Sequence, residues 1–500
     1  MDITKLDDVS LKMVERREEA TISPWESAKA NPTIIAHCFC AGVASILWDF
    51  DIGISTITIA LPGFKMVFGY EYEGQLLVSA TWNALWGAMT FLGMLLGSLM
   101  CGWVSDRFGR RLGFQIASGI SILGIGLQYA ASEPGLLLAG KMINGLALGF
   151  FLTLTPIYIS EIAPQPLRPA LTAAVNLFIN AGQMTAIGIG NTRFSILSPA
   201  SYKVLFAAQW AFPCFLVFYT AVMPESPWFL LRSQREEDTK NAFCKLYPRN
   251  AKGAEAALEL IRSAITEENE MVRLQDGAKY ADCFKETNFR RTRIACGMFF
   301  VQQFTGIAFY AQALYFLGIT GLPVSLTFKL ALGGFGLAMF GNIVSWFILN
   351  YVGRRTLLLV GTVLNFMLLT TVGIAGCFTS STSLYIIGYL MSFAQIVYAP
   401  TIGATTWAVS AEASSQRLRA RTQGVAMFSN AIISWAMGFV TPYLINTDSA
   451  NLGAKAAFVW AGLCIVSFAW VWFEVPELGR KTTSELDELF RQKTPTRKFR

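Results

Sequence analysis

Residues 106–111 read DRFGRR and residues 350–355 read NYVGRR, and each stretch follows a long apolar run. A glycine next to basic residues predicts a tight turn at both places. Gly353 lies 244 positions after Gly109. Because the two turns hold the same place relative to their apolar runs, they indicate that the chain contains two related halves.

Two further motif pairs recur at almost the same separation. Glu161 is followed seven residues later by Arg168, and Glu412 is followed seven residues later by Arg419, 251 positions further on. Pro-Glu closes an apolar run at residues 224–225 and again at 476–477, 252 positions later. Three pairs in one order and at nearly one offset predict the duplication of a helical unit.

The composition indicates a membrane protein. The chain has 500 residues, of which 53% are hydrophobic and 15% charged, whereas soluble domains carry about a quarter charged residues. A bilayer span needs about 20 mostly apolar residues. Such runs lie near residues 34–59, 77–104, 112–131, 136–160, 171–192, 203–223, 294–318, 325–350, 356–378, 384–409, 421–445 and 454–474. We therefore predict an all-α membrane protein with twelve transmembrane helices in two six-helix pseudo-repeats.

The polar stretches divide the chain. We expect an N-tail over 1–33, the first half over 34–223, a helical linker over 224–293, the second half over 294–474 and a C-tail over 475–500. In the linker, Leu258, Ile261, Ile265 and Val272 follow a near-helical spacing that favours short amphipathic helices, although a solvated linker is the alternative. Residues 1–33 and 491–500 have the composition of flexible tails.

The basic residues gather on one side of the predicted membrane. With even-numbered turns inside, the inner segments hold 34 of the 40 lysines and arginines. By the positive-inside rule, both termini and the linker are cytoplasmic. This asymmetry explains the net charge of +7 without a nucleic-acid partner.

Acidic residues and arginines at the inner ends of the spans can form ion pairs and helix-end contacts. We interpret them as a cytoplasmic gate that closes the inner mouth. Arginine after a span is also ordinary positive-inside sequence, which is the alternative for any single motif. The predicted gate residues are Asp106, Arg107, Arg110, Glu161, Arg168, Glu225, Arg354, Arg355, Glu412, Arg419 and Glu477.

Metal and cofactor sites are not predicted. The nine cysteines form no CxxC pair, and His37 is the single histidine. No phosphate-binding glycine loop and no recurring nucleophile, base and orienting residue appear. We therefore expect that the protein binds no metal and no cofactor and that it is not an enzyme.

Taken together, the motifs resemble the sugar-porter family of the major facilitator superfamily. They are GWVSDRFGRR (102–111), PIYISEIAP (156–164), PESPWFLL (224–231), QQFTGI (302–307), YVGRR (351–355) and PELGRKT (476–482). Within that family, residues 50–69 and PYLIN (442–446) are most similar to fungal permeases of the α-glucoside (maltose) type. The resemblance implies the major facilitator fold and the transport of a sugar by alternating access.

Three ionisable residues lie inside predicted spans, where a charge is costly. They are Asp49, Asp51 and Lys141. A rise of 1.5 Å per residue places Asp51 and Lys141 at similar depths, so the two can pair. The resemblance implies that Asp51 accepts the proton and that Lys141, where the family has arginine, is its counter-charge. A structural ion pair or a lysine that reaches outward is the alternative. Asp49 lies about 200° around the helix from Asp51 and has no assigned role.

A sugar site needs amides, hydroxyls and aromatic rings rather than formal charges. The middle of the spans offers Asn176, Gln302, Gln303, Tyr310, Gln312, Asn342, Trp407 and Asn430. The resemblance implies sugar binding by Gln302, Gln303, Trp407 and Asn430. Ala308 and Asn176 depart from the residues of hexose carriers, which favours a different or larger glycoside. Any one buried amide can also serve helix association.

We therefore expect a monomeric plasma-membrane protein that moves a glycoside together with protons. A hexose carrier, facilitative or proton-coupled, is the main alternative. A sugar sensor is a further alternative, which residues 475–500 disfavour because such receptors usually have a long cytoplasmic tail.

Overall fold

The chain forms twelve long apolar helices in the computed structural model, so the predicted fold class is confirmed. The structure describes residues 24–72, 74–164, 166–248, 258–259, 261–263, 265–266, 280–319, 322–378, 380–415, 418–446, 449–479, 483–492 and 494–496. Within these residues, 12 helices are long and apolar enough to cross a membrane.

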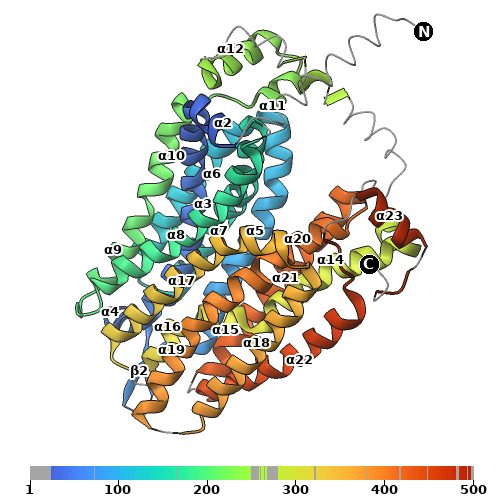
Figure 1. Cartoon of the computed structure of the whole chain (residues 1–500). Helices are drawn as coiled ribbons and strands as arrows, with labels where there is room; N and C mark the ends of the chain where they lie inside the picture. Colours follow the sequence, from blue (N-terminus) through green and yellow to red (C-terminus); the bar gives the residue numbers. More distant parts are fainter. Residues whose placement is uncertain are drawn as a thin grey trace, which may run out of the picture.

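The twelve spans form two groups in the order of the chain (Figure 1). The first group is α3 (Pro32–Ala60), α5 (Ala80–Phe108), α6 (Arg110–Ala130), α7 (Pro134–Ile162), α8 (Arg168–Asn191) and the pair α9 (Ala200–Gln209) and α10 (Ala211–Val222). The second group begins with a broken seventh span, α14 (Glu286–Gln302), η3 (Gln303–Ile307), α15 (Ala308–Ala311) and α16 (Ala313–Ile319). It continues with α17 (Val324–Tyr351), α18 (Arg354–Ala375), α19 (Ser381–Tyr398), η4 (Ala399–Gly403), α20 (Ala404–Ala413), α21 (Arg419–Ile445), η6 (Gly453–Ala456) and α22 (Ala457–Glu474).

Short elements mark the two ends of the molecule. The linker end carries α2 (Pro24–Ala30), α11 (Pro227–Arg232), α12 (Glu236–Leu246), η2 (Tyr280–Phe284) and α23 (Thr483–Arg491). The hairpin end carries α4 (Pro62–Phe68) and the antiparallel strands β1 (Tyr70–Tyr72) and β2 (Gln75–Leu77), in which Tyr70 pairs with Leu77. In the linker, Leu258 and Ile265 are buried. Val272 lies outside the described residues, as do residues 1–23 and 497–500 of the two tails.

Small residues let α5 and α7 approach closely in the first half. A Cβ atom on Gly145 would lie 2.4 Å from the backbone oxygen of Thr90, and one on Gly149 would lie 2.2 Å from that of Met94. Glycines four residues apart on one helix face form such backbone-to-backbone contacts inside membranes. This crossing fixes the position of α7, which carries Lys141.

Two spans of the second half are interrupted. The seventh span has a π turn over Gln303–Ile307, within which Gly306 has a φ of 101°. The tenth span has a π turn over Ala399–Gly403 that contains Pro400. Such turns inside helices often occur at functional sites, because they bring backbone and side chains out of the regular helical pattern.

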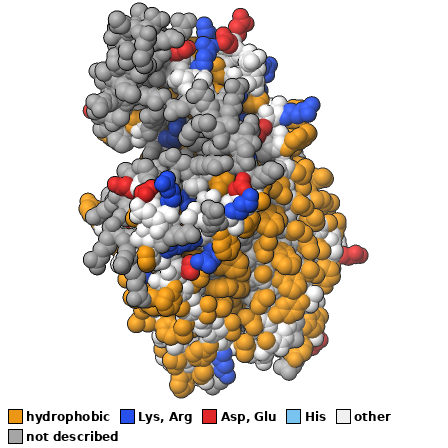
Figure 2. Space-filling view, turned by 90° about the vertical axis from the view of Figure 1, so that its right-hand side faces the viewer, with side chains coloured by type: hydrophobic (Ala, Val, Ile, Leu, Met, Phe, Trp, Pro, Cys, Tyr) orange, Lys and Arg blue, Asp and Glu red, His pale blue; other side chains and the backbone are white. Residues whose placement is uncertain are grey.

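The lower part of the side shown in Figure 2 is largely apolar, as a surface that faces lipid requires. The charged side chains in this view gather mainly toward the linker end, above the apolar area. Exposed apolar residues include Leu99, Phe218 and Phe473, all within spans. In water such a surface would be unstable, so the bilayer is part of the folded state.

Candidate functional site

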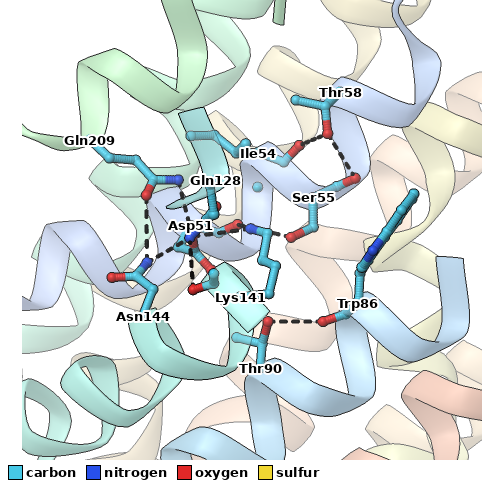
Figure 3. Close-up of polar contacts among 12 residues, drawn as sticks. Asp51, Ile54, Ser55, Thr58, Trp86, Thr90, Gln128, Lys141, Asn144 and Gln209 are labelled. Atoms are coloured by element: carbon cyan, nitrogen blue, oxygen red, sulfur yellow. Dashed lines mark hydrogen bonds and ion pairs between the residues drawn. The ribbon is translucent and has the colours of Figure 1, made fainter. Parts of the chain in front are cut away.

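A buried ion pair lies inside the first half. The Asp51 carboxylate of α3 and the Lys141 ammonium of α7 are joined by a distance of 3.1 Å between Oδ1 and Nζ. The side chains are 0% and 2% exposed. Lys141 Nζ also donates to the backbone oxygen of Asp51 at 3.3 Å. The structure thus brings together the two charges that the sequence placed at similar depths (Figure 3).

Two amides that the sequence interpretation missed complete this cluster. Asn144 Nδ2 of α7 and Gln209 Nε2 of α9 each donate to Asp51 Oδ1 at 3.0 Å. Ser121 Oγ of α6 donates to Asn144 Oδ1 at 2.8 Å. Asp51 Oδ1 therefore accepts three hydrogen bonds, whereas its Oδ2 is buried without a partner among the described residues. A signal for Asn144 was present, because it follows Lys141 by three residues and shares its helix face.

One predicted sugar-binding residue of the seventh span and one of the eleventh are joined at the π turn. Gln303 Nε2 donates to Ser434 Oγ of α21 at 2.7 Å, and Ser434 Oγ donates to Asn430 Oδ1 at 3.3 Å. Gln302, the residue before Gln303, is also buried. This chain of contacts joins two of the predicted residues, Gln303 and Asn430, through Ser434, which the sequence interpretation did not include.

The other predicted sugar-binding residues lie in different surroundings. Trp407 of α20 is 47% exposed and packs edge-on against Phe299, with ring centroids 5.1 Å apart. Asn176 of α8 is exposed, and its backbone oxygen accepts from Asn180 Nδ2 at 3.0 Å. Asn342 of α17 is half-buried. Trp407 and Asn176 are thus accessible inside their spans.

Two of the predicted residues are held inside the second half. Tyr310 is buried, and its hydroxyl donates to Asn365 Oδ1 of α18 at 3.2 Å. The amide oxygen of Gln312 is buried without a hydrogen-bond partner in the described part of the chain. Tyr310 also lines a small cavity between the halves, together with Thr56, Gln183 and Gln395.

At the linker end of the first half, acids and arginines bind one another within that half. Arg110 donates from Nε and Nη2 to the two carboxylate oxygens of Glu161, at 3.1 and 2.8 Å. The Glu225 carboxylate accepts from the backbone N–H groups of Arg110, at 2.9 Å, and Arg111, at 3.2 Å, and so caps the first turn of α6. A Cβ atom on Gly109, whose φ is 93°, would lie 2.4 Å from Glu225, so the turn requires glycine.

Burial raises the pKa of Glu225, whereas the backbone N–H groups of Ser226, Arg110 and Arg111 and the charge of Arg110 lower it. The net direction is upward because desolvation of the carboxylate is the largest effect.

The second half repeats this cluster. Glu477 accepts from the backbone N–H groups of Arg354 and Arg355 at 2.8 and 3.1 Å, so it caps α18 as Glu225 caps α6. Arg354 Nη2 donates to Glu412 Oε1 at 3.1 Å. A Cβ atom on Gly353 would lie 2.2 Å from Glu477. The motif offsets therefore correspond to equivalent contacts in space.

The second arginine of each turn binds the end of the last span in its half. Arg111 donates to the backbone oxygens of Thr220 at 2.6 Å and Ala221 at 3.0 Å, at the end of α10. Arg355 donates to the backbone oxygen of Trp472 at 2.7 Å, at the end of α22. Cations at helix C-termini interact favourably with the helix dipole.

The remaining predicted gate residues are peripheral to these two clusters. Asp106 is exposed and lies 3.8 Å from Arg110. Arg107 lies over the rings of Trp103 and Phe108. Arg168 donates to the backbone oxygen of Ala163 at 3.5 Å. The side chain of Arg419 lies outside the described part of the chain.

The two halves meet through polar contacts at the hairpin end. Tyr443 of α21 is 3.1 Å from the Thr81 hydroxyl of α5, oxygen to oxygen. Asn446 Nδ2 donates to the backbone oxygen of Val78 at 3.1 Å, and Asn446 Oδ1 accepts from the Tyr315 hydroxyl. Asn446 is completely buried. Tyr443 and Asn446 belong to the PYLIN stretch, so this motif contributes contacts between the halves.

Comparison with known proteins identifies the family. The model of the family described as "Sugar (and other) transporter" matches residues 37–490. The chain belongs to this family. The transporter is 33% identical over 494 residues to the MFS transporter fmqE of Aspergillus fumigatus, covering 96% of the transporter and 92% of that relative. It is 29% identical over 489 residues to the general alpha-glucoside permease of Saccharomyces cerevisiae, covering 96% and 79% respectively.

Solved structures confirm the fold. The inward-open xylose transporter XylE of E. coli matches with a TM-score of 0.74 at 18% identity, covering 91% of the transporter and 99% of XylE. The resemblance to major facilitator sugar porters, inferred from six motifs, is confirmed by the family match. The protein is a multi-pass membrane transporter of the sugar-transporter family, and these relatives are transporters rather than enzymes.

Proposed function

We propose that the protein couples the uptake of an α-glucoside or related glycoside to protons by alternating access. The proposal rests on the contacts of the buried Asp51 carboxylate. One of its oxygens is paired with Lys141, and the other has no hydrogen-bond partner among the described residues. A buried carboxylate with one unoccupied oxygen can take up a proton without first losing its hydrogen bonds. Intramembrane ionisable residues commonly serve ion and proton pathways.

In this mechanism, protonation changes the charge of the cluster. Ionised Asp51 and Lys141 together carry no net charge, and protonation of Asp51 leaves the lysine ammonium without a counter-charge. This imbalance favours a rearrangement of α3 against α7, which biases the equilibrium between the two access states. Lysine adds a second titratable group that arginine would not provide.

The side chains of the second half support a neutral glycoside as the substrate class. Gln303, Ser434 and Asn430 offer amide and hydroxyl groups, and Trp407 offers an accessible ring that can stack on a sugar. The general alpha-glucoside permease is a relative over nearly the whole chain, and a D-xylose-proton symporter is among the structural neighbours. We therefore favour a glycoside over a charged substrate.

Alternating access requires contacts that differ between states. The polar contacts of Tyr443 and Asn446 hold the hairpin end closed. The capping clusters of Glu225 and Glu477 each lie inside one half, so they keep the helices of that half together while the halves rotate. We propose that the linker end and both termini are cytoplasmic, that the protein resides in the plasma membrane and that the monomer is the transporting unit.

Uptake measurements in a transport-deficient cell test this function. Labelled maltose and labelled glucose would be supplied with and without a protonophore. We expect accumulation of maltose that the protonophore abolishes. Glucose uptake that is insensitive to the protonophore, without maltose uptake, would instead establish a facilitative hexose carrier.

A further inference from the structure

The hydrogen bonds around Asp51 are distributed unequally between its two oxygens. Lys141 Nζ, Asn144 Nδ2 and Gln209 Nε2 all donate to Oδ1, at 3.1, 3.0 and 3.0 Å. Within the described residues, Oδ2 has no hydrogen-bond partner although it is buried. The ion pair alone accounts for one donor, so the two amides need a separate explanation.

Both amides are held in place by neighbours of their own. Ser121 Oγ donates to Asn144 Oδ1 at 2.8 Å, which turns the N–H₂ end of Asn144 toward Asp51. Gln209 Oε1 lies 3.5 Å from Asn144 Nδ2, so the two amides contact one another as well. Asn144, Gln209 and Ser121 are all completely buried. An oriented and buried donor favours the ionised form of the carboxylate that accepts from it.

Within the described residues, few other charged side chains lie near this carboxylate. Lys141 of α7 is the charged side chain in contact with it. Asp49 lies on the same helix about 200° away. The Lys203 ammonium of α9 lies over the ring of Tyr129, 5.5 Å from its centroid. The described side chains of α6 that surround the cluster, such as Ser121 and Gln128, are uncharged.

We propose that Asn144 and Gln209 are positioning residues for proton coupling: their N–H groups fix Asp51 by Oδ1, so that Oδ2 is the oxygen that takes up and releases the proton. This inference rests on the proposed function of Asp51. Loss of either amide removes a donor to the ionised form, and Asp51 then keeps its proton to higher pH. Loss of Ser121 leaves the amide in place but frees its orientation, so its effect has the same sign and is smaller.

Infrared spectroscopy of the full-length protein in lipid nanodiscs tests the proposal without a substrate. The carbonyl band of protonated Asp51 is the band that Asp51→Asn removes, and its intensity against pH gives the titration midpoint. We expect Asn144→Ala and Gln209→Ala each to raise this midpoint by about one pH unit, and Ser121→Ala to raise it by less. If Asn144→Ala does not fold, Gln209→Ala provides the same measurement from another helix.

Gln128→Ala is the matched control. Gln128 is a completely buried amide of α6 that donates to the backbone oxygen of Gly140 at 3.4 Å, outside the contacts of Asp51. Its loss should lower stability and leave the midpoint unchanged. Equal midpoints in the wild type, Asn144→Ala and Gln209→Ala would overturn the proposal, as would equal shifts in all variants including Gln128→Ala.

Two results separate the positioning role of the amides from the coupling role of Asp51. If Asp51→Asn abolishes accumulation while the midpoints do not move, only the positioning role is wrong. If the midpoints move as expected while Asp51→Asn still accumulates substrate, the amides position Asp51, but Asp51 does not couple transport and the proposed function is wrong.

Discussion

The first half of the protein is packed around a buried ion pair, whereas the second half has π turns in two spans near its predicted sugar-binding residues. In the first half, Gly145 and Gly149 bring α7 against α5, and this crossing holds Lys141 beside Asp51. In the second half, the seventh and tenth spans break at Gly306 and Pro400, next to Gln303 and before Trp407. The capping clusters of the two halves are equivalent, and the halves differ in the interior of their spans.

The difference has a physical reason. A buried ion pair is costly unless its geometry is fixed, which calls for close contacts between the helices that carry it. A neutral sugar needs groups that can approach it from several directions, which interrupted helices provide. We therefore expect changes in the first half to affect coupling and folding, and changes in the second half to affect affinity.

The largest expected effect is that of Asp51→Asn. Removal of the negative charge should reduce accumulation of labelled maltose to equilibrium, while exchange of maltose across the membrane persists. Asp49→Asn is the matched control, because it removes a carboxylate two residues away that makes no contact with Lys141 in the described structure. Normal accumulation by Asp51→Asn would show that the buried pair is structural.

The next effect concerns the close helix crossing. Gly149→Ala would place a Cβ atom 2.2 Å from the backbone oxygen of Met94. Overpacking of this kind lowers the free energy of unfolding by about 1–3 kcal/mol or more. We expect a lower Tm and a smaller folded fraction by size-exclusion chromatography in detergent. Gly336→Ala in α17, where no atom lies within 4 Å of the added Cβ, should be tolerated. Equal stability of the two variants would contradict the close contact between α5 and α7 at Gly149.

A moderate effect is expected from Gln302→Ala and Gln303→Ala. Loss of a neutral hydrogen bond costs about 0.5–1.5 kcal/mol, which corresponds to a roughly 2- to 10-fold weaker apparent affinity. The measurement is the KM of maltose exchange, which does not require a proton gradient. Gln128→Ala, a buried amide of the first half, should leave this KM unchanged. An unchanged KM in both second-half variants would remove these glutamines from the sugar site.

The smallest expected effect is a shift between access states. Asn446→Leu removes the hydrogen bonds to Val78 and Tyr315, so the hairpin end should open more often. Labelling of a Thr327→Cys background by an impermeant maleimide in intact cells should become several-fold faster. Thr327 is suited to this purpose because it lines a cavity of about 260 Å³ between the halves at this end.

The control for this shift is Asn191→Leu in the same Thr327→Cys background. Asn191 is an exposed residue and the last residue of α8. Labelling of the protein without Thr327→Cys gives the contribution of its own cysteines. Slower or unchanged labelling in Asn446→Leu would mean that the PYLIN contacts do not hold the hairpin end closed.

Much of the fold was accessible from the sequence because membranes impose simple rules. Span length gives the number of helices, and the offsets of Gly353 and Glu477 give the repeated contacts of the two halves. The approach of Lys141 to Asp51 followed from depth alone. These predictions need only distances along a helix.

The rest depends on which helices touch. Gln209 lies in the sixth span, and its contact with Asp51 requires α9 to pack beside α3, which no spacing along the chain reveals. The capping role of Glu225 requires the end of the sixth span to meet the start of the third. The division of the predicted sugar residues into accessible Trp407 and buried Tyr310 likewise follows from the breaks in the second half.

The most direct test of proton-coupled glycoside uptake is proton influx into proteoliposomes that contain the purified protein and a pH-sensitive dye. Addition of maltose outside, without an imposed gradient, should acidify the lumen in the wild type and not in Asp51→Asn. Maltose entry without acidification in the wild type would contradict the central claim.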